Sequence, residues 1–139
     1  MDGKLMEYFN RQPRLGVIST SSRDGRVDSA VYGSPQMIDE KTVLVAFARG
    51  RTWANLLENP HAVYMIMEPG QGLQDWKGIR VYLRMKEHFQ SGPRLEAYKR
   101  EAAKIVGEEA VRMIAVLAAF EVEEVRPLID FGQGWVRGI

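Results

Sequence analysis

The sequence predicts a mainly β fold with flanking helices, in which short antiparallel strands form a closed or partly closed barrel. Apolar residues recur at every second position in several short segments, and turn residues separate these segments. Small helices interrupt the strands, a pattern that favours an antiparallel barrel over a parallel α/β sheet. A chain of 139 residues has room for one core, so we expect a single domain over residues 1–139.

The first elements are a short helix and a hairpin. Residues 4–12 carry apolar residues at helical spacing, and this pattern stops before Pro13. From residue 15 the period changes to two, which predicts a strand over residues 15–20. Asp24-Gly25 then supplies a hairpin turn, and residues 26–33 form the returning strand.

A buried strand and a two-turn helix follow. Residues 42–48 are a nearly continuous apolar run rich in β-branched residues, which is typical of a strand buried on both faces. In the next segment Thr52 is a candidate N-cap, Asn59 is a candidate C-terminal cap, and Pro60 ends the helix.

Two further strands, a long helix and a last strand complete the fold. The strands over 62–68 and 79–89 are separated by a glycine-rich loop that contains Trp76 and is longer than a hairpin requires. Long loops on rigid sheets often carry function. A helix is predicted over 91–106, with a further turn or two after Gly107, and the final strand over 116–125.

Composition excludes several classes of partner. With 19 Lys and Arg against 18 Asp and Glu, the net charge is +1, so no single-sign field attracts a nucleic acid or a membrane surface. Cysteine is absent, which excludes thiolate chemistry and fits a reducing compartment. The first residues lack the apolar core of a signal peptide, and the longest apolar run, 113–120, is far shorter than the roughly 20 residues of a membrane helix. We expect a cytoplasmic protein with no nucleic-acid or membrane partner.

Sharp catalytic signatures are missing. The chain has no zinc-protease, P-loop, nucleophile-elbow or EF-hand motif. Its two histidines, His61 and His88, lie at the ends of predicted strands, where we interpret them as surface or edge residues rather than metal ligands or bases. We therefore expect no metal site, and the pattern names no catalytic residue.

One segment has the residues of an anion site. Arg49, Arg51 and Thr52 stand at the expected helix start, where unpaired backbone N–H groups and a partial positive charge favour a phosphate. Asn55 follows one turn later, so its amide can reach the same helix end. The alternative is that Thr52 merely caps a short helix beside two solvated arginines, and spacing alone favours this alternative.

The order of the segments resembles a known family. The strand Leu15-Gly16-Val17-Ile18-Ser19-Thr20, the Asp24-Gly25 turn, the strand through Val31-Tyr32-Gly33-Ser34-Pro35 and the later Arg51-Thr52-x-x-Asn55-Leu56-x-x-Asn59-Pro60 carry the resemblance. Together they resemble the pyridoxamine 5′-phosphate oxidase-like FMN-binding split-barrel family, over residues 5–130. The resemblance implies a six-stranded antiparallel split β-barrel. It also implies a homodimer with one FMN in each of two grooves at the subunit interface.

The resemblance further implies a set of FMN contacts. The start of the two-turn helix matches the family's phosphate-binding segment, residues 30–33 match the strand whose backbone lies along the flavin ring, and the end of the third strand lies beside the ribityl chain and phosphate. The long loop contributes across the ring or from the other subunit. The full set is Ala30, Val31, Tyr32, Gly33, Phe47, Ala48, Arg51, Thr52, Asn55, Gln74, Trp76 and Lys77. For Tyr32 and Trp76 the alternatives are core packing and loop anchoring.

By this resemblance the protein is an FMN-dependent oxidoreductase that takes electrons from a reduced nicotinamide and passes them to an unidentified small molecule. The flavin itself carries the electrons, so the protein needs no acid/base pair. The family's named oxidase has a C-terminal basic motif for pyridoxal phosphate, and here only Arg137 stands near the end, so the vitamin B6 reaction is not implied. The alternatives are a non-catalytic flavin electron carrier and a split barrel that binds a deazaflavin or haem.

Overall fold

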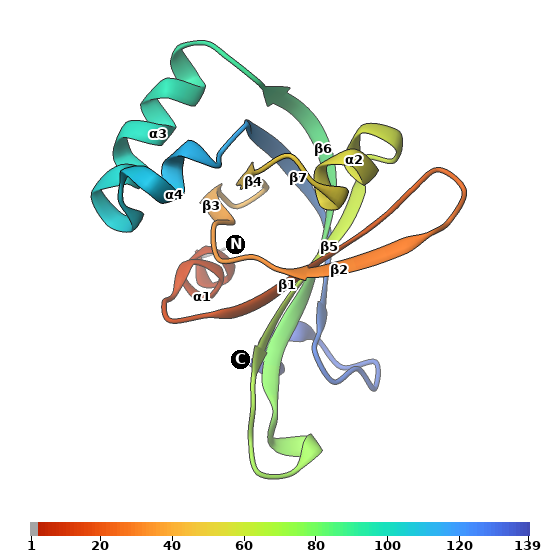
Figure 1. The fold of residues 1–139 in the computed structure, drawn as a ribbon. Helices are drawn as coiled ribbons and strands as arrows, with labels where there is room; N and C mark the ends of the chain where they lie inside the picture. The colour runs from red at the N-terminus through yellow and green to blue at the C-terminus, as the bar shows by residue number, and fades with distance from the viewer. Residues whose placement is uncertain (1–2) are drawn as a thin grey trace.

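The computed structural model describes residues 3–139, which form a seven-stranded antiparallel sheet with α-helices around it (Figure 1). The strands are β1 Leu15–Ser21, β2 Val27–Val31, β3 Gln36–Asp39, β4 Thr42–Phe47, β5 His61–Glu68, β6 Lys77–Phe89 and β7 Val116–Pro127. The α-helices are α1 Lys4–Asn10, α2 Arg51–Glu58, α3 Pro93–Val106 and α4 Glu108–Arg112. Short 3-10 helices cover Leu73–Asp75 and Trp135–Gly138.

The strand order is β2-β1-β5-β6-β7-β4-β3, and every neighbouring pair is antiparallel. Strands β2 and β3 are consecutive in the chain yet stand at opposite ends of this order. Because only residues 32–35 connect them, the sheet must curl until its two ends meet there. The short link between β2 and β3 is therefore the place where the barrel closes.

The seven strands correct the expected number of six. The additional strand is β3, which follows Pro35 and pairs with β4 over Gln36 to Asp39. Four residues are too few to show a period of two, and only Met37 among them is buried. The predicted second strand is also shorter than expected: β2 ends at Val31, and the chain leaves it there to reach β3 at the other end of the sheet order.

The predicted hairpin turn and long helix are confirmed. The Gly25 amide donates to the Ser22 carbonyl, and Gly25 has a φ of +86°, a conformation that glycine adopts without strain. Helix α3 has Pro93 in its first turn and ends before Gly107. No helix within residues 3–139 is long and apolar enough to cross a membrane.

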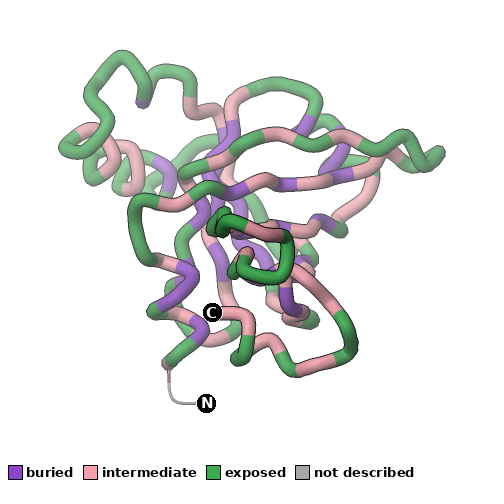
Figure 2. The backbone as a smooth tube through the Cα atoms, turned by 90° about the horizontal axis from the view of Figure 1, so that it is seen from below, coloured by how far each residue is buried: buried purple, intermediate pink, exposed green. Residues whose placement is uncertain are grey.

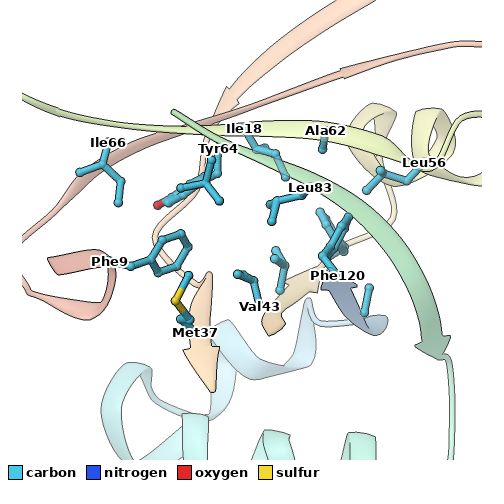
Figure 3. Close-up of a cluster of buried hydrophobic side chains, with 14 of the residues drawn as sticks. Phe9, Ile18, Met37, Val43, Leu56, Ala62, Tyr64, Ile66, Leu83 and Phe120 are labelled. Carbon is cyan, nitrogen blue, oxygen red and sulfur yellow. The ribbon is translucent and has the colours of Figure 1, made fainter. Parts of the chain in front are cut away.

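The core lies between the curled sheet, α1 and α2. Burial is concentrated in the middle of the molecule, and the hairpin ends and most of α3 are exposed (Figure 2). Alternate residues of β1 and β5 point inward, as the period of two predicts. Large side chains meet in this core (Figure 3), among them Phe9, Ile18, Met37, Leu56, Tyr64, Leu83 and Phe120.

Candidate functional site

Helix α2 begins two residues earlier than the sequence indicates. Its N-cap is Gly50, which has an extended backbone and no side chain, so no side chain caps the first turn. The predicted N-cap role of Thr52 is therefore wrong, whereas Asn59 does stand at the C-cap. Because Thr52 lies inside the first turn, capping no longer explains its hydroxyl at this position.

Thr52 faces the end of β2. It is 6% exposed, and the half-buried Tyr32 lies against it. Burial raises the pKa of the Tyr32 phenol, and a side-chain hydrogen bond with Thr52 opposes this shift. The Tyr32 ring lies 5.4 Å from the Phe47 ring, which lies 5.6 Å from the stacked ring of Trp53. Thr52 therefore stands at the edge of a row of aromatic rings formed by Tyr32, Phe47 and Trp53.

Asn55 attaches α2 to the sheet. Its Nδ2 donates to Oγ1 of Thr20 on β1 at 3.1 Å, and both side chains are buried. The spacing to Thr52 predicts that this amide reaches the helix start. In the structure the amide points into the sheet instead. A buried bond of this kind fixes where the first turn of α2 lies relative to β1 and β2.

Arg51 is the exposed cation of the site. Its side chain is 75% exposed, and Nη1 lies 3.8 Å from Oδ1 of Asp28, which is 23% exposed. An exposed ion pair at this distance contributes about 0–1 kcal/mol. The guanidinium can therefore leave Asp28 at little cost when a stronger anion is present.

The remaining predicted residues of β2 and β4 surround this helix start. Ala30 shares a strand face with Asp28 and Tyr32, whereas Val31 points to the opposite face. Gly33 is exposed just beyond β2, and the half-buried Ala48 follows β4. One chain therefore brings together the predicted contacts from β2, β4 and α2, except the Val31 side chain, which lies on the opposite face of β2.

The predicted loop contacts lie elsewhere in the chain. Helix α2 precedes the start of β5, and the loop with Gln74, Trp76 and Lys77 follows its end (Figure 1). The strand from His61 to Glu68 spans about 23 Å at about 3.3 Å per residue. A single chain does not place these three residues beside α2.

Sequence reasoning missed three residues of this site: Asp28, Thr20 and Trp53. Asp28 is opposite Thr20 in the β1–β2 register, on the face that α2 covers. The period of two could have placed Asp28 on the same face as Ala30, because the two are two residues apart. The contact of Trp53 with Phe47 depends on how α2 packs, and no sequence signal predicts it.

No protein-family model and no curated protein matches this chain. Among solved structures, an FMN-binding protein from Syntrophomonas wolfei subsp. wolfei has a TM-score of 0.72 and 22% identity, covering 91% of this chain and 84% of its own. An F420 reductase has a TM-score of 0.64 and 14% identity, covering 86% and 94%. HutZ, the haem storage protein from Vibrio cholerae, has a TM-score of 0.64 and 15% identity, covering 90% and 94%.

These similarities establish the fold. The chain is a split barrel, mainly β with flanking helices, which confirms the fold that the sequence resemblance implies. The three names refer to FMN, F420 and haem. The ligand of this chain therefore depends on its own residues.

Proposed function

We propose that the protein binds FMN at the start of α2 and acts as an FMN-dependent oxidoreductase on a small molecule. One observation carries the proposal: the first turn of α2 has no side-chain cap, and Thr52 and Arg51 stand there. Unpaired helix amides, a hydroxyl and a guanidinium are the donors that a phosphate monoester needs.

The residues present fit the rest of the cofactor. The aromatic row of Tyr32, Phe47 and Trp53 gives an apolar surface next to the phosphate donors. Asp28 is the only carboxylate described here beside Arg51, and it is paired with that arginine. Binding of a phosphate requires Arg51 to turn from Asp28 toward the ligand, and the weak pairing permits this turn.

The chain's own residues bind and orient the cofactor. Arg51, Thr52 and the α2 amides hold the phosphate, and residues 30–33 lie along the ring. Tyr32 keeps its proton near neutral pH, since the ordinary pKa of tyrosine is 10.0 and burial raises it further, so its phenol is available as a donor. When bound, the flavin supplies the electron-accepting chemistry, and no acid/base pair of the protein is required.

A second copy of the chain completes the proposed site. Strand β2 is at one end of the sheet, and its outward residues Val27 and Val31 are 78% and 73% exposed. An edge strand with exposed valines favours association with another chain. In a homodimer the loop with Gln74, Trp76 and Lys77 can come from the partner.

No observation favours haem over a flavin. A haem iron needs an axial ligand such as histidine, and both histidines of this chain are exposed. His61 lies 3.5 Å from Glu123, and His88 lies edge-on to Trp53. His61 follows the end of α2, whereas the His88 ring contacts Trp53 in the first turn of α2.

The test is to purify the protein without added cofactor, record its visible spectrum and identify the molecule that denaturation releases. We expect an oxidised flavin spectrum and released FMN. Rapid bleaching by a reduced nicotinamide supports the oxidoreductase, whereas bleaching by chemical reductants alone supports the electron carrier. A released deazaflavin or haem would contradict the FMN proposal.

A further inference from the structure

A partly buried arginine lies beside the link that closes the barrel. Arg14 Nη1 donates to the Phe9 carbonyl at 2.7 Å, and Nη2 donates to the carbonyls of Gly33 and Pro35 at 2.8 Å each. The guanidinium lies 5.3 Å and 5.2 Å from the ring centroids of Phe9 and Tyr64. Burial lowers the pKa of Arg14, and its buried Nε has no partner within residues 3–139.

Tyr64 acts on the same link from β5. Its hydroxyl donates to the Tyr32 carbonyl at 2.6 Å, and its side chain is fully buried. The hydroxyl fits because residue 16 is glycine: a Cβ there would lie 1.8 Å from the Tyr64 oxygen. We name Arg14, Gly16 and Tyr64 the carbonyl clasp. Burying a cation with an unpaired nitrogen destabilises the folded chain. Packing alone therefore does not explain why an arginine occupies position 14.

The clasp determines where the amides of the link point. The carbonyls of Tyr32 and Gly33 are both bonded inward, to Tyr64 and Arg14. In a trans peptide the C=O and the following N–H point in opposite directions. The N–H groups of Gly33 and Ser34 therefore point outward, and neither donates to an acceptor within the described residues. Gly33 is exposed, and a Cβ there would meet nothing within 4 Å.

We propose that Arg14 and Tyr64 are positioning residues that present the Gly33 and Ser34 amides as a pair of donors to the polar edge of a flavin ring. The inference rests on the proposed function, because it assumes that a flavin lies along residues 30–33. The ring carries carbonyl and nitrogen acceptors at one edge. Two preset N–H groups next to Tyr32 match such acceptors, and the α2 start binds the phosphate at the other end of the cofactor.

The carbonyl clasp acts on the flavin ring, whereas α2 acts on the phosphate. A comparison of FMN with riboflavin, which has the ring but no phosphate, therefore separates the two roles. Tyr64→Phe removes only the hydroxyl that donates to the Tyr32 carbonyl. Arg14→Lys removes the guanidinium that donates to the carbonyls of Gly33 and Pro35. Both variants should weaken FMN and riboflavin by the same factor, about two- to tenfold for a hydrogen bond, and should shift the visible absorption band of bound FMN. A role in stability alone would move neither the band nor the affinity.

The matched control is Arg11→Lys. Arg11 lies 5.2 Å over the Tyr8 ring and makes no bond to the 33–35 segment. It should leave the band and both affinities unchanged. An unshifted band in the two clasp variants, with wild-type binding intact, would overturn this inference alone. A wild-type protein that binds no FMN would overturn the proposed function and this inference together.

Discussion

Two regions implicated in the same ligand differ in how they are built. The start of α2 is fixed by the buried bond from Asn55 to Thr20 and lies against buried aromatic rings. The loop with Gln74 and Trp76 is mostly exposed, and its backbone amides at positions 75 and 76 donate only to carbonyls of the same loop. The first region is complete within one chain. The second can join it only through another copy, so the two regions should respond differently to mutation and to concentration.

The largest expected effect comes from breaking the α2 region. Thr52→Val removes a donor to the phosphate while keeping the side-chain shape. A hydrogen bond to a charged group contributes about 1.5–3 kcal/mol, so FMN affinity should fall roughly ten- to hundredfold. Riboflavin affinity should stay near its wild-type value, because riboflavin has no phosphate. Titration of both ligands by flavin fluorescence measures the ratio, and Thr42→Val on β4 is the control. Equal losses for both ligands would remove Thr52 from the phosphate site.

A smaller loss is expected from the exposed cation of the same region. Arg51→Ala should weaken FMN about tenfold and riboflavin much less, and added salt should reduce the difference. Arg100→Ala, on the exposed part of α3, is the control for a general change in charge. A salt-independent loss would contradict an ionic role for Arg51.

Asp28→Asn sharpens the comparison by acting in the opposite direction. The carboxylate lies 3.8 Å from Arg51 and competes with a phosphate for that guanidinium. Its neutralisation should strengthen FMN binding by about two- to fivefold at low salt and leave riboflavin unchanged. Isothermal titration at two salt concentrations measures this. Weaker FMN binding would mean that Asp28 accepts hydrogen bonds from the cofactor instead of competing with it.

The loop region should depend on a second chain. FMN should quench Trp76 emission in the dimer, so Trp76→Phe should reduce the total tryptophan quenching. In Val27→Lys, which places a charge on the exposed edge of β2 and outside the predicted FMN contacts, this difference should vanish together with the dimer seen by sedimentation. Ile105→Lys, on exposed α3, should change neither. Quenching of Trp76 that persists in a monomer would contradict the partner's role.

The smallest expected effect is the loss, in acid, of the stabilisation that Asp130 gives to the end of the barrel beside the loop with Trp76. Hydrogen bonds from the Gly132 amide and from Arg126 lower the pKa of Asp130. The carboxylate therefore stabilises the folded chain above its ordinary pKa of 3.8, and this contribution is lost as the pH falls through its lower value in the folded state.

Asp130 also accepts from Arg80 at 2.7 Å, and the Leu128 amide donates to Gly78 beside the loop. The 3-10 helix that begins at Trp135 contacts β6 and β7, the strands that carry Arg80 and Arg126. The NMR signal of the Trp135 indole should therefore shift in acid before signals from α2 do. Asp130→Asn should show the acid form at neutral pH, and Asp24→Asn, on the distant β1–β2 turn, should not. If the Trp135 signal and the α2 signals shifted at the same pH, a local effect of Asp130 would be contradicted.

The parts of the fold that the sequence predicts depend on neighbours along the chain. The Asp24-Gly25 turn, the proline at the start of α3 and the alternation in β1 are local patterns, and the structure confirms them. Strand β3 is not predictable in this way, because its four residues become a strand only by pairing with β4. The cap of α2 depends on the backbone of Gly50, which no side chain signals.

The same limit applies to the candidate site. Arg51, Thr52 and Asn55 form a local motif, whereas the Asp28 partner of Arg51 and the Thr20 partner of Asn55 come from strands 23 and 35 residues away. The bonds from Arg14 to Gly33 and Pro35 exist only once the barrel closes. Contacts that form when the barrel closes leave no periodic pattern in the sequence. They are therefore found only in the structure.

The most direct test of the central claim is a crystal structure of the protein grown with excess FMN. We expect the phosphate to lie within hydrogen-bond distance of the Thr52 hydroxyl and the first-turn amides of α2, with Arg51 turned from Asp28 toward it. A phosphate bound elsewhere, with Arg51 still paired to Asp28, would contradict the account.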